Sequence, residues 1–243
     1  MRNRLVLLAG WGLGVAPLEP LALALQGLNE RLHVQVEPLP DFSEGDFADW
    51  LDELDTSLPQ DCWLGGWSLG GMLATALAAR RQERCCGLLT LASNPCFVAR
   101  ADWPDAMSVE TFKAFEEGCR SDPVATLKRF ALLCAQGADD ARGFGRLLYS
   151  SASQTRAEAL LAGLELLATV DVRQALQQFS GPQLHLLGES DALVPATLSS
   201  ALLTLQPDIE VGVLESGSHA FVLERPHEVA AVIQAFLSEV ADD

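Results

Sequence analysis

The feature that most constrains the fold of this chain is the segment 62–72. An apolar run leads there into Gly66-Trp67-Ser68-Leu69-Gly70 and then into a helical pattern. A strand that turns sharply into a helix holds the corner residue at positive φ, where side chains two positions away collide. Gly66 and Gly70 remove those side chains. The pattern Gly-x-Ser-x-Gly therefore predicts that Ser68 stands at such a corner with an exposed hydroxyl.

A serine in this conformation is typical of a nucleophile. The strained backbone costs about 1–3 kcal/mol, which functional sites tolerate and ordinary connections seldom need. The N–H of Leu69 follows the corner and is expected to point into the same space as an oxyanion donor. The alternative is an ordinary turn of small residues, because Gly-x-Ser-x-Gly also occurs by chance. An acid and a histidine later in the chain would favour the nucleophile.

Apolar strands alternate with helices in two parts of the chain, which is typical of a parallel sheet covered on both faces. We expect strands at 4–9, 33–38, 87–92, 183–187 and 210–214, helices at 18–28, 47–54, 196–205 and 226–240, and a strand, corner and helix over 62–81. Between 98 and 178 the pattern changes to helices without strands. The sequence thus predicts an α/β fold with a mostly parallel central sheet, in which 1–97 and 179–243 form the core and 98–178 a helical lid.

An acid and a histidine do follow the serine, each after an expected strand. Asp191 comes after 183–187, and His219 comes after 210–214. A serine hydroxyl is a poor nucleophile near pH 7, so it needs an imidazole to take its proton and a carboxylate to orient that imidazole. The order Ser68, Asp191, His219 is the order of the α/β-hydrolase fold.

Two other carboxylates remain alternatives for the acid. Glu189 lies two residues before Asp191, and Glu215 follows the last expected strand. We prefer Asp191 because the three residues 193–195, Leu-Val-Pro, have the pattern of a turn into the next helix.

Trp11 lies in a glycine-rich loop after the first strand. Because the carboxyl ends of parallel strands share one crevice, this loop and Ser68 are expected to meet. The N–H of Trp11 is then the natural second oxyanion donor, and its indole would wall the acyl pocket. The alternative is that Trp11 is only an apolar plug.

The overall composition excludes several classes of protein. The 243 residues, 49% of them hydrophobic, suffice for one large globular domain. The formal net charge of −17 argues against binding to nucleic acid or to an anionic membrane surface. The six cysteines have no Cys-x-x-Cys spacing, which indicates free thiols in a reducing compartment. We expect a cytoplasmic protein and a monomer.

The N-terminal apolar run, 5–9, follows two arginines as in a signal peptide. Glycines at 10, 12 and 14 interrupt it at once, so we expect a buried strand. No segment approaches the roughly 20 apolar residues of a membrane span.

With these residues in place, the chain resembles the α/β-hydrolase superfamily. Within it, the chain resembles the carboxylesterases of biotin synthesis, which hydrolyse the methyl ester of pimeloyl-acyl carrier protein. The likeness covers nearly the whole length and rests on four segments: 8–13 (Leu-Ala-Gly-Trp-Gly-Leu), 63–71 around the serine, 92–97 (Ala-Ser-Asn-Pro-Cys-Phe) with Trp103-Pro104, and 163–167 (Gly-Leu-Glu-Leu-Leu) with 169–173.

The resemblance implies roles for individual residues. Ser68 would be the nucleophile, with Asp191 and His219 as its partners, and Trp11 and Leu69 would contact the substrate and the oxyanion. The acyl pocket would be lined by one stretch of the lid, namely Phe130, Ala131, Leu132, Leu133 and Cys134. No metal and no organic cofactor would be needed.

Two positions depart from the family pattern. Many relatives have histidine before the Gly-Trp-Gly loop, whereas this chain has Ala9. A further basic residue is also expected where Ala125 stands, and the neighbouring Lys128 is a candidate to replace it.

The charge pattern indicates an acidic protein partner. Residues 120–156 carry six basic side chains and only three acidic ones, an excess of three positive charges in a strongly acidic chain. A basic island steers an acidic partner to one face, and acyl carrier protein is such a partner. We expect Lys128, Arg129, Arg142 and Arg146 to contact it. The alternative is a solvated helical face that only aids solubility.

The residues therefore predict a serine carboxylesterase, and the family resemblance implies that its substrate is the methyl ester of pimeloyl-acyl carrier protein. Three alternatives remain. The first is a generalist short-chain carboxylesterase on free esters, and the second is an acyltransferase or carbon–carbon hydrolase with the same triad. The third is a non-catalytic binding protein with the hydrolase fold.

Overall fold

Six strands form a single parallel sheet in the order β2-β1-β3-β4-β5-β6. The computed structural model describes residues 3–41, 45–152 and 156–242. The strands are β1 (Arg4–Leu8), β2 (His33–Glu37), β3 (Cys62–Trp67), β4 (Cys85–Leu91), β5 (Gln183–Gly188) and β6 (Glu210–Leu214). The predicted α/β fold is confirmed, and the strands lie where their apolar runs placed them.

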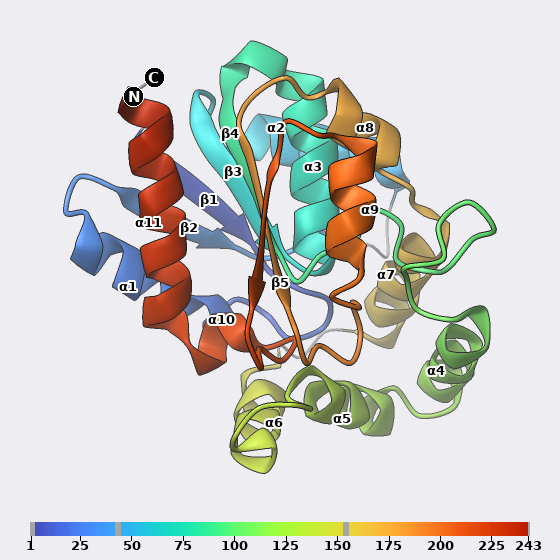
Figure 1. The fold of residues 1–243 in the computed structure, drawn as a ribbon. Helices are drawn as coiled ribbons and strands as arrows, with labels where there is room; N and C mark the ends of the chain where they lie inside the picture. Colours follow the sequence, from blue (N-terminus) through green and yellow to red (C-terminus); the bar gives the residue numbers. More distant parts are fainter. Residues whose placement is uncertain (1–2, 42–44, 153–155, 243) are drawn as a thin grey trace.

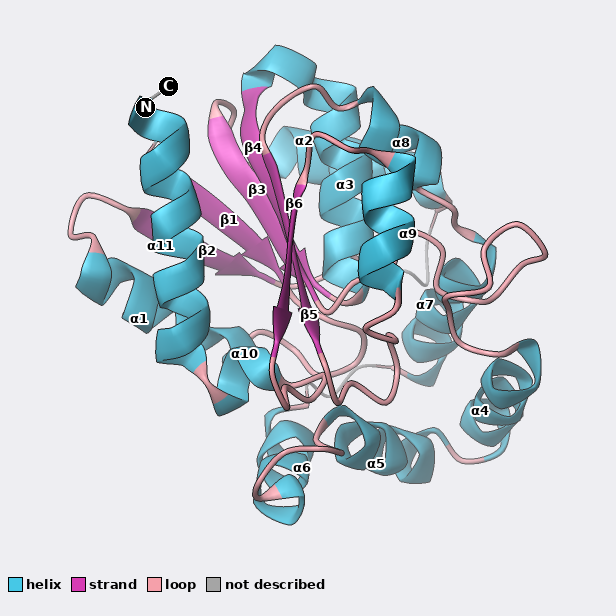
Figure 2. Ribbon diagram, in the orientation of Figure 1, coloured by secondary structure: helices cyan, strands magenta, loops and turns pink. Residues whose placement is uncertain are grey.

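Helices cover both faces of the sheet (Figures 1 and 2). On one face α1 (Glu19–Leu28), which follows a 3-10 turn at Ala16–Leu18, packs against α11 (Pro226–Asp242). The other face carries α2 (Phe47–Ser57), α3 (Leu69–Arg81), α8 (Arg173–Gln178) and α9 (Leu198–Leu205). The sequence did not predict α10 (Phe221–Glu224) or the 3-10 turn Gln82–Arg84, because a single turn is too short to show a helical period.

Four helices between β4 and β5 form what we call the helical insertion. They are α4 (Val109–Ser121), α5 (Pro123–Cys134), α6 (Ala141–Ser151) and α7 (Ala157–Thr169). The Asp122 carboxylate caps α5 by accepting a hydrogen bond from Ala125 N at 2.9 Å. In Figure 1, α4, α5 and α6 lie beyond the carboxyl ends of the strands. The fifth helix of the segment, α8, packs instead against α3 on the sheet.

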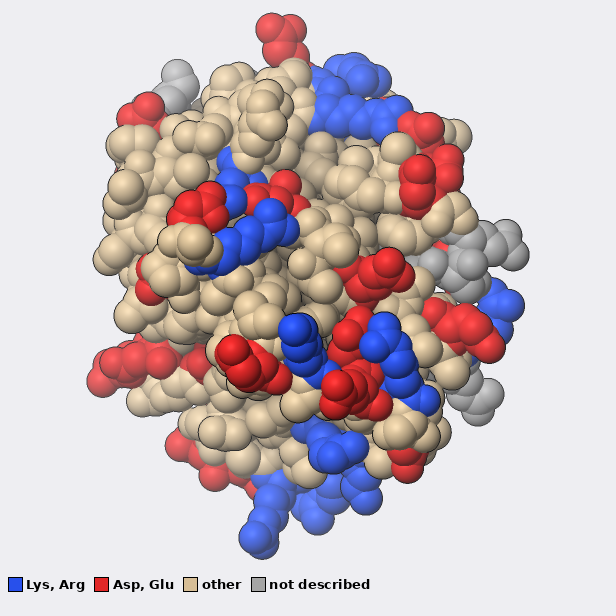
Figure 3. Space-filling view, turned by 90° about the vertical axis from the view of Figure 1, so that its right-hand side faces the viewer, with Lys and Arg blue, Asp and Glu red and all other residues tan. Residues whose placement is uncertain are grey.

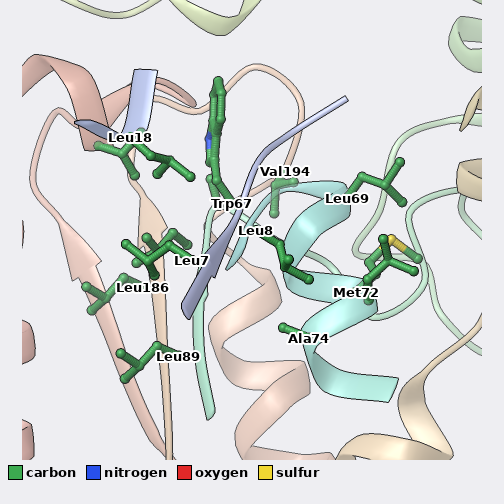
Figure 4. Close-up of a cluster of buried hydrophobic side chains, with 14 of the residues drawn as sticks. Leu7, Leu8, Leu18, Trp67, Leu69, Met72, Ala74, Leu89, Leu186 and Val194 are labelled. Atoms are coloured by element: carbon green, nitrogen blue, oxygen red, sulfur yellow. The ribbon is translucent and has the colours of Figure 1, made fainter. Parts of the chain in front are cut away.

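The core lies on both faces of the central strands. Every residue of β3 and β5 is buried, whereas the edge strands β2 and β6 are partly exposed. Figure 4 shows how consecutive residues of β1 serve both layers: Leu7 points to the side of Leu186, and Leu8 points towards Met72 of α3. The sheet is therefore a rigid platform whose carboxyl edge faces the helical insertion.

Candidate active site

Ser68 occupies a strained corner between β3 and α3. Its φ is 54° and its ψ is −119°. A Cβ on Gly66 would lie 2.2 Å from the carbonyl carbon of Gly70, and a Cβ on Gly70 would lie 2.4 Å from the carbonyl oxygens of Leu8 and Ala9. Both glycines are thus required by the close approach of backbone to backbone. The corner holds Ser68 at the start of α3, at the carboxyl edge of the sheet.

The backbone N–H groups of Leu69 and Trp11 are the expected oxyanion donors. Leu69 is the first residue of α3, so its N–H has no acceptor within the helix. Among the described residues, none of the turn, loop and cap hydrogen bonds between backbone atoms has Leu69 N or Trp11 N as its donor. Their role as oxyanion donors stays a prediction.

Asp191 and His219 form a buried pair. Their side chains are fully buried, and Nδ1 of His219 lies 2.7 Å from Oδ2 of Asp191. The other carboxylate oxygen, Oδ1, accepts hydrogen bonds from Leu193 N at 2.7 Å and Val194 N at 2.9 Å. The turn after β5 thus fixes the carboxylate, and the carboxylate fixes the imidazole.

The two alternative acids have other partners. The Glu189 carboxylate accepts a hydrogen bond from Ser216 N at 2.8 Å. Glu215 takes part through its backbone carbonyl, which accepts a hydrogen bond from Arg225 at 2.7 Å. Of the three carboxylates, only Asp191 is hydrogen-bonded to His219 among the described residues.

The second ring nitrogen of His219 is left without a partner. Nε2 is buried and makes no hydrogen bond with the described residues. The indole N–H of Trp67, next to Ser68 in the chain, donates to the His219 carbonyl at 2.9 Å, and the two rings lie 5.7 Å apart. This hydrogen bond holds His219 beside the strand-to-helix corner at Ser68. The Ser68 hydroxyl makes no hydrogen bond with Nε2 here, and catalytic hydrogen bonds often tighten only when substrate binds.

Trp11 connects the site to the helical insertion. Its indole N–H donates to the carbonyl of Leu160, on α7, at 2.9 Å. Its ring packs edge-on against Phe130 at 4.9 Å and Phe115 at 5.5 Å. These rings and Leu133 line a narrow apolar cavity of about 70 Å³ between the β1 loop and the insertion.

The five residues 130–134 do not share one surface. Phe130 and Leu133 line the apolar cavity, whereas Ala131 and Cys134 are buried outside its lining. Leu132 is 44% exposed and lies against Gly145 of α6. Five consecutive residues of a helix point in all directions, so only some of them can face the site.

Cys134 contacts the loop that carries His219 through its backbone. Its carbonyl accepts a hydrogen bond from Ala220 N at 3.0 Å and so steadies the loop that carries His219. Burial raises the pKa of its thiol well above the ordinary value. The thiol is therefore protonated near neutral pH and is a poor nucleophile.

A second, larger cavity has no local signal in the sequence. It has a volume of about 530 Å³ and is lined by the glycine-rich loop around Trp11, by Leu39 after β2 and by Leu160 of α7, with Asp41 and Arg156 at its edge. The last two form an ion pair. These residues come from three separate segments, so no local pattern could have joined them.

The basic residues expected to contact a carrier protein lie together on the insertion. Lys128 and Arg129 are on α5, Arg142 and Arg146 are on α6, and all four are exposed. Figure 3 shows basic side chains gathered at the lower end of the molecule, where Figure 1 places these helices. None of the four forms an ion pair with a residue that the structure describes. Their contact with a partner stays a prediction.

Two kinds of feature are absent from the described residues. No group of three or more His, Cys, Asp or Glu side chains there could hold a metal ion. No described helix is both long enough and apolar enough to cross a membrane.

A model of the Alpha/beta hydrolase family matches residues 5–232. The chain belongs to this family. The resemblance inferred from the motifs is thereby confirmed. Another hydrolase, named Pimeloyl-[acyl-carrier protein] methyl ester esterase, from Aeromonas hydrophila subsp. hydrophila, is 36% identical over 244 residues, which is 96% of this chain and 94% of that protein.

A longer relative is the Biotin biosynthesis bifunctional protein BioHC of Cellvibrio japonicus. It is 35% identical over 246 residues, which is 99% of this chain but 48% of that protein. The chain thus spans about half the length of this hydrolase.

Solved hydrolase structures share the fold at low identity. A bromoperoxidase from Bacillus anthracis superimposes with a TM-score of 0.83 at 20% identity, covering 98% of this chain and 92% of that one. An esterase from Exiguobacterium antarcticum gives a TM-score of 0.82 at 15% identity, covering 97% and 92%. At such identities the similarity concerns the fold and not the substrate.

Proposed function

We propose that the protein is a serine carboxylesterase that hydrolyses the methyl ester of pimeloyl-acyl carrier protein. The observation that carries the proposal is the strained Ser68 corner beside the buried pair of Asp191 and His219. The substrate is taken from relatives of similar length, whose printed names specify this ester. The apolar lining of the cavity beside Trp11 also suits the methylene groups of an acyl chain better than a polar group.

The reaction follows from the positions of these groups. His219 Nε2 takes the proton of the Ser68 hydroxyl, whose oxygen attacks the ester carbonyl. The N–H groups of Leu69 and Trp11 stabilise the oxyanion. His219 returns the proton to the leaving oxygen, methanol departs, and water then hydrolyses the acyl-enzyme in the same manner. Asp191 keeps the imidazole in the required tautomer and stabilises its charge.

The segment 98–178 acts in this proposal as the lid, and 1–97 with 179–243 act as the core. The helices of the lid contribute Phe130 and Leu133 to the apolar cavity, and the carbonyl of Leu160 accepts the hydrogen bond that fixes the Trp11 indole. The exposed Lys128, Arg129, Arg142 and Arg146 lie on the same helices and would receive the acidic carrier protein. The acyl chain would then reach Ser68 from the side on which the carrier binds.

The test compares three substrates: the carrier-bound methyl ester, free dimethyl pimelate and a short aryl ester. We expect the highest kcat/KM for the carrier-bound ester. Ser68→Ala should lower kcat on the order of 10⁶-fold, because removing the nucleophile disables the whole triad. Ser200→Ala, on the exposed side of α9, is the matched control and should leave kcat unchanged.

Each other result has a definite meaning. Equal rates on free and carrier-bound esters would replace the proposal with a generalist esterase. Full activity of Ser68→Ala would remove Ser68 as the nucleophile. No hydrolysis together with no labelling of Ser68 by a reactive phosphonate would indicate a binding protein with the hydrolase fold.

A further inference from the structure

A second buried serine touches the backbone of the catalytic corner. Ser93 follows β4, is 5% exposed, and donates a hydrogen bond from its Oγ to the carbonyl oxygen of Ser68 at 2.7 Å. The same carbonyl accepts Gly71 N at 2.9 Å. The Ser68 carbonyl therefore has two donors, one from its own turn and one from a neighbouring strand.

This carbonyl belongs to the peptide group that supplies the expected oxyanion donor. The C=O of Ser68 and the N–H of Leu69 share one planar trans peptide, so they point in opposite directions. A donor on the oxygen fixes the plane and hence the direction of the N–H. It also polarises the peptide and makes the N–H more positive, since linked hydrogen bonds strengthen one another.

The fold accepts unfavourable geometry to make this contact. Ala92, immediately before Ser93, has φ of 47°, which is rare for a residue with a side chain. Gly71 leaves the space that Ser93 needs, because a Cβ on Gly71 would lie 2.6 Å from both Cβ and Oγ of Ser93. The hydrogen bond from Ser93 is thus accompanied by strained backbone at Ala92 and by a glycine at position 71. These two features indicate that the position of the Ser93 hydroxyl matters.

We propose that Ser93 is a positioning residue for the oxyanion site, acting through the Ser68–Leu69 peptide. The inference rests on the proposed esterase function. Ser93 does not touch the substrate in this account. Its hydroxyl orients and strengthens the Leu69 N–H, so its effect belongs to the transition state, where charge develops on the substrate oxygen.

The decisive variant is Ser93→Ala, assayed with dimethyl pimelate. We expect kcat to fall about tenfold while KM changes less than twofold, because only the transition state carries the oxyanion. A trifluoromethyl ketone analogue of the substrate forms a tetrahedral adduct with an oxyanion. Its inhibition constant should rise by about the same factor as kcat falls.

Thr75→Val is the matched control. Thr75 is 2% exposed, and its Oγ1 donates to the Gly71 carbonyl at 2.8 Å, so it is another buried hydroxyl on the backbone of α3. That carbonyl is not part of the Ser68–Leu69 peptide. The control should lose stability as Ser93→Ala does but retain kcat and inhibitor affinity. Equal losses of kcat in the two variants would show a merely structural role and overturn the proposal.

A readout without substrate separates this inference from the proposed function. A hydrogen bond to the Ser68 carbonyl deshields the amide nitrogen of Leu69 through their shared peptide. In Ser93→Ala the ¹⁵N resonance of Leu69 should move upfield, and in Thr75→Val it should stay in place. An unmoved resonance would overturn the inference even in an active enzyme. If the resonance moved in a protein without esterase activity, the proposed function would be refuted. The effect of Ser93 on the Ser68–Leu69 peptide would still be supported.

Discussion

His185 is a buried titratable side chain that the proposed chemistry does not use. It lies on β5, is 2% exposed, and its Nδ1 is 2.6 Å from Oγ1 of Thr90 on β4. Burial lowers its pKa to about 4 from the 6.5 of an exposed imidazole. The folded protein therefore keeps this residue neutral at pH values where the unfolded chain already binds a proton.

This difference predicts how stability depends on pH. Below pH 6.5 the unfolded state takes up the proton first, so the contribution of His185 falls with pH until the folded state also titrates near pH 4. Between pH 7 and pH 5 the free energy of unfolding should drop by about 2 kcal/mol through this residue. Urea titrations of wild type and His185→Gln should show a flatter pH dependence in the variant. The exposed His33→Gln is the control, and a variant as steep as wild type would contradict the prediction.

The residues of the candidate site that can be predicted from the sequence are those marked by a local pattern. Ser68 is marked by its flanking glycines, and Asp191 and His219 by their places after strands. Ser93 lies inside a segment that supported the family resemblance, yet nothing in its spacing indicates a hydrogen bond to residue 68. Such contacts join strands that are neighbours only in the folded sheet, so they follow from packing and not from pattern.

At the scale of elements, one buried arginine joins α2 to α3. The Arg81 side chain is fully buried, and its Nε donates to Oδ1 of Asp55 at 2.7 Å. Its terminal nitrogens donate to the carbonyls of Pro59 at 2.7 Å and Leu58 at 3.1 Å. The guanidinium also donates to the carbonyl of Asp55 at 3.0 Å, so it satisfies one carbonyl in the last turn of α2 and two in the segment that follows.

Arg81→Met should therefore destabilise the protein by about 3 kcal/mol, because it removes the closest cation from the Asp55 carboxylate and leaves several carbonyls unpaired. Arg80→Met is the control on the preceding residue, whose side chain is 41% exposed and pairs with Asp52 and, at 3.6 Å, with the other oxygen of Asp55. It should cost less than about 1 kcal/mol. Urea unfolding measures both values. Similar losses in the two variants would mean that the buried network does not hold α2.

Element prediction succeeded where burial is continuous and weakened where only one face of an element is buried. The central strands are buried on both faces, so their continuous apolar runs were sufficient to find them. The run 130–134 was assigned to the pocket as a whole, whereas α5 turns Leu132 away to α6. Consecutive residues are enough to locate a strand or a loop. On a helix, only the residues that share one face can line the same pocket.

At the scale of the whole molecule, charge is distributed unevenly. The chain carries a formal net charge of −17, yet exposed basic residues gather on α5 and α6. An acidic partner would be repelled by most of the surface and attracted to this end. At 0.1 M ionic strength the screening length is about 10 Å, so such steering weakens as salt is added. The association step is therefore the one that salt should change.

The prediction is a salt dependence that is specific to the substrate. Raising NaCl from 50 to 500 mM should lower kcat/KM for the carrier-bound ester by about tenfold and change that for dimethyl pimelate less than twofold, since only the former needs charged docking. The double variant Arg142→Glu and Arg146→Glu should lower the carrier-bound value by at least about tenfold at low salt and leave the free ester unaffected. The double variant Arg31→Glu and Arg84→Glu is the charge-matched control, because these exposed residues precede β2 and β4 at the amino ends of the strands. If this control had the same effect as the variant at Arg142 and Arg146, net charge alone would govern the rate. If neither had any effect, the basic residues of the insertion would serve solubility and the carrier would dock elsewhere.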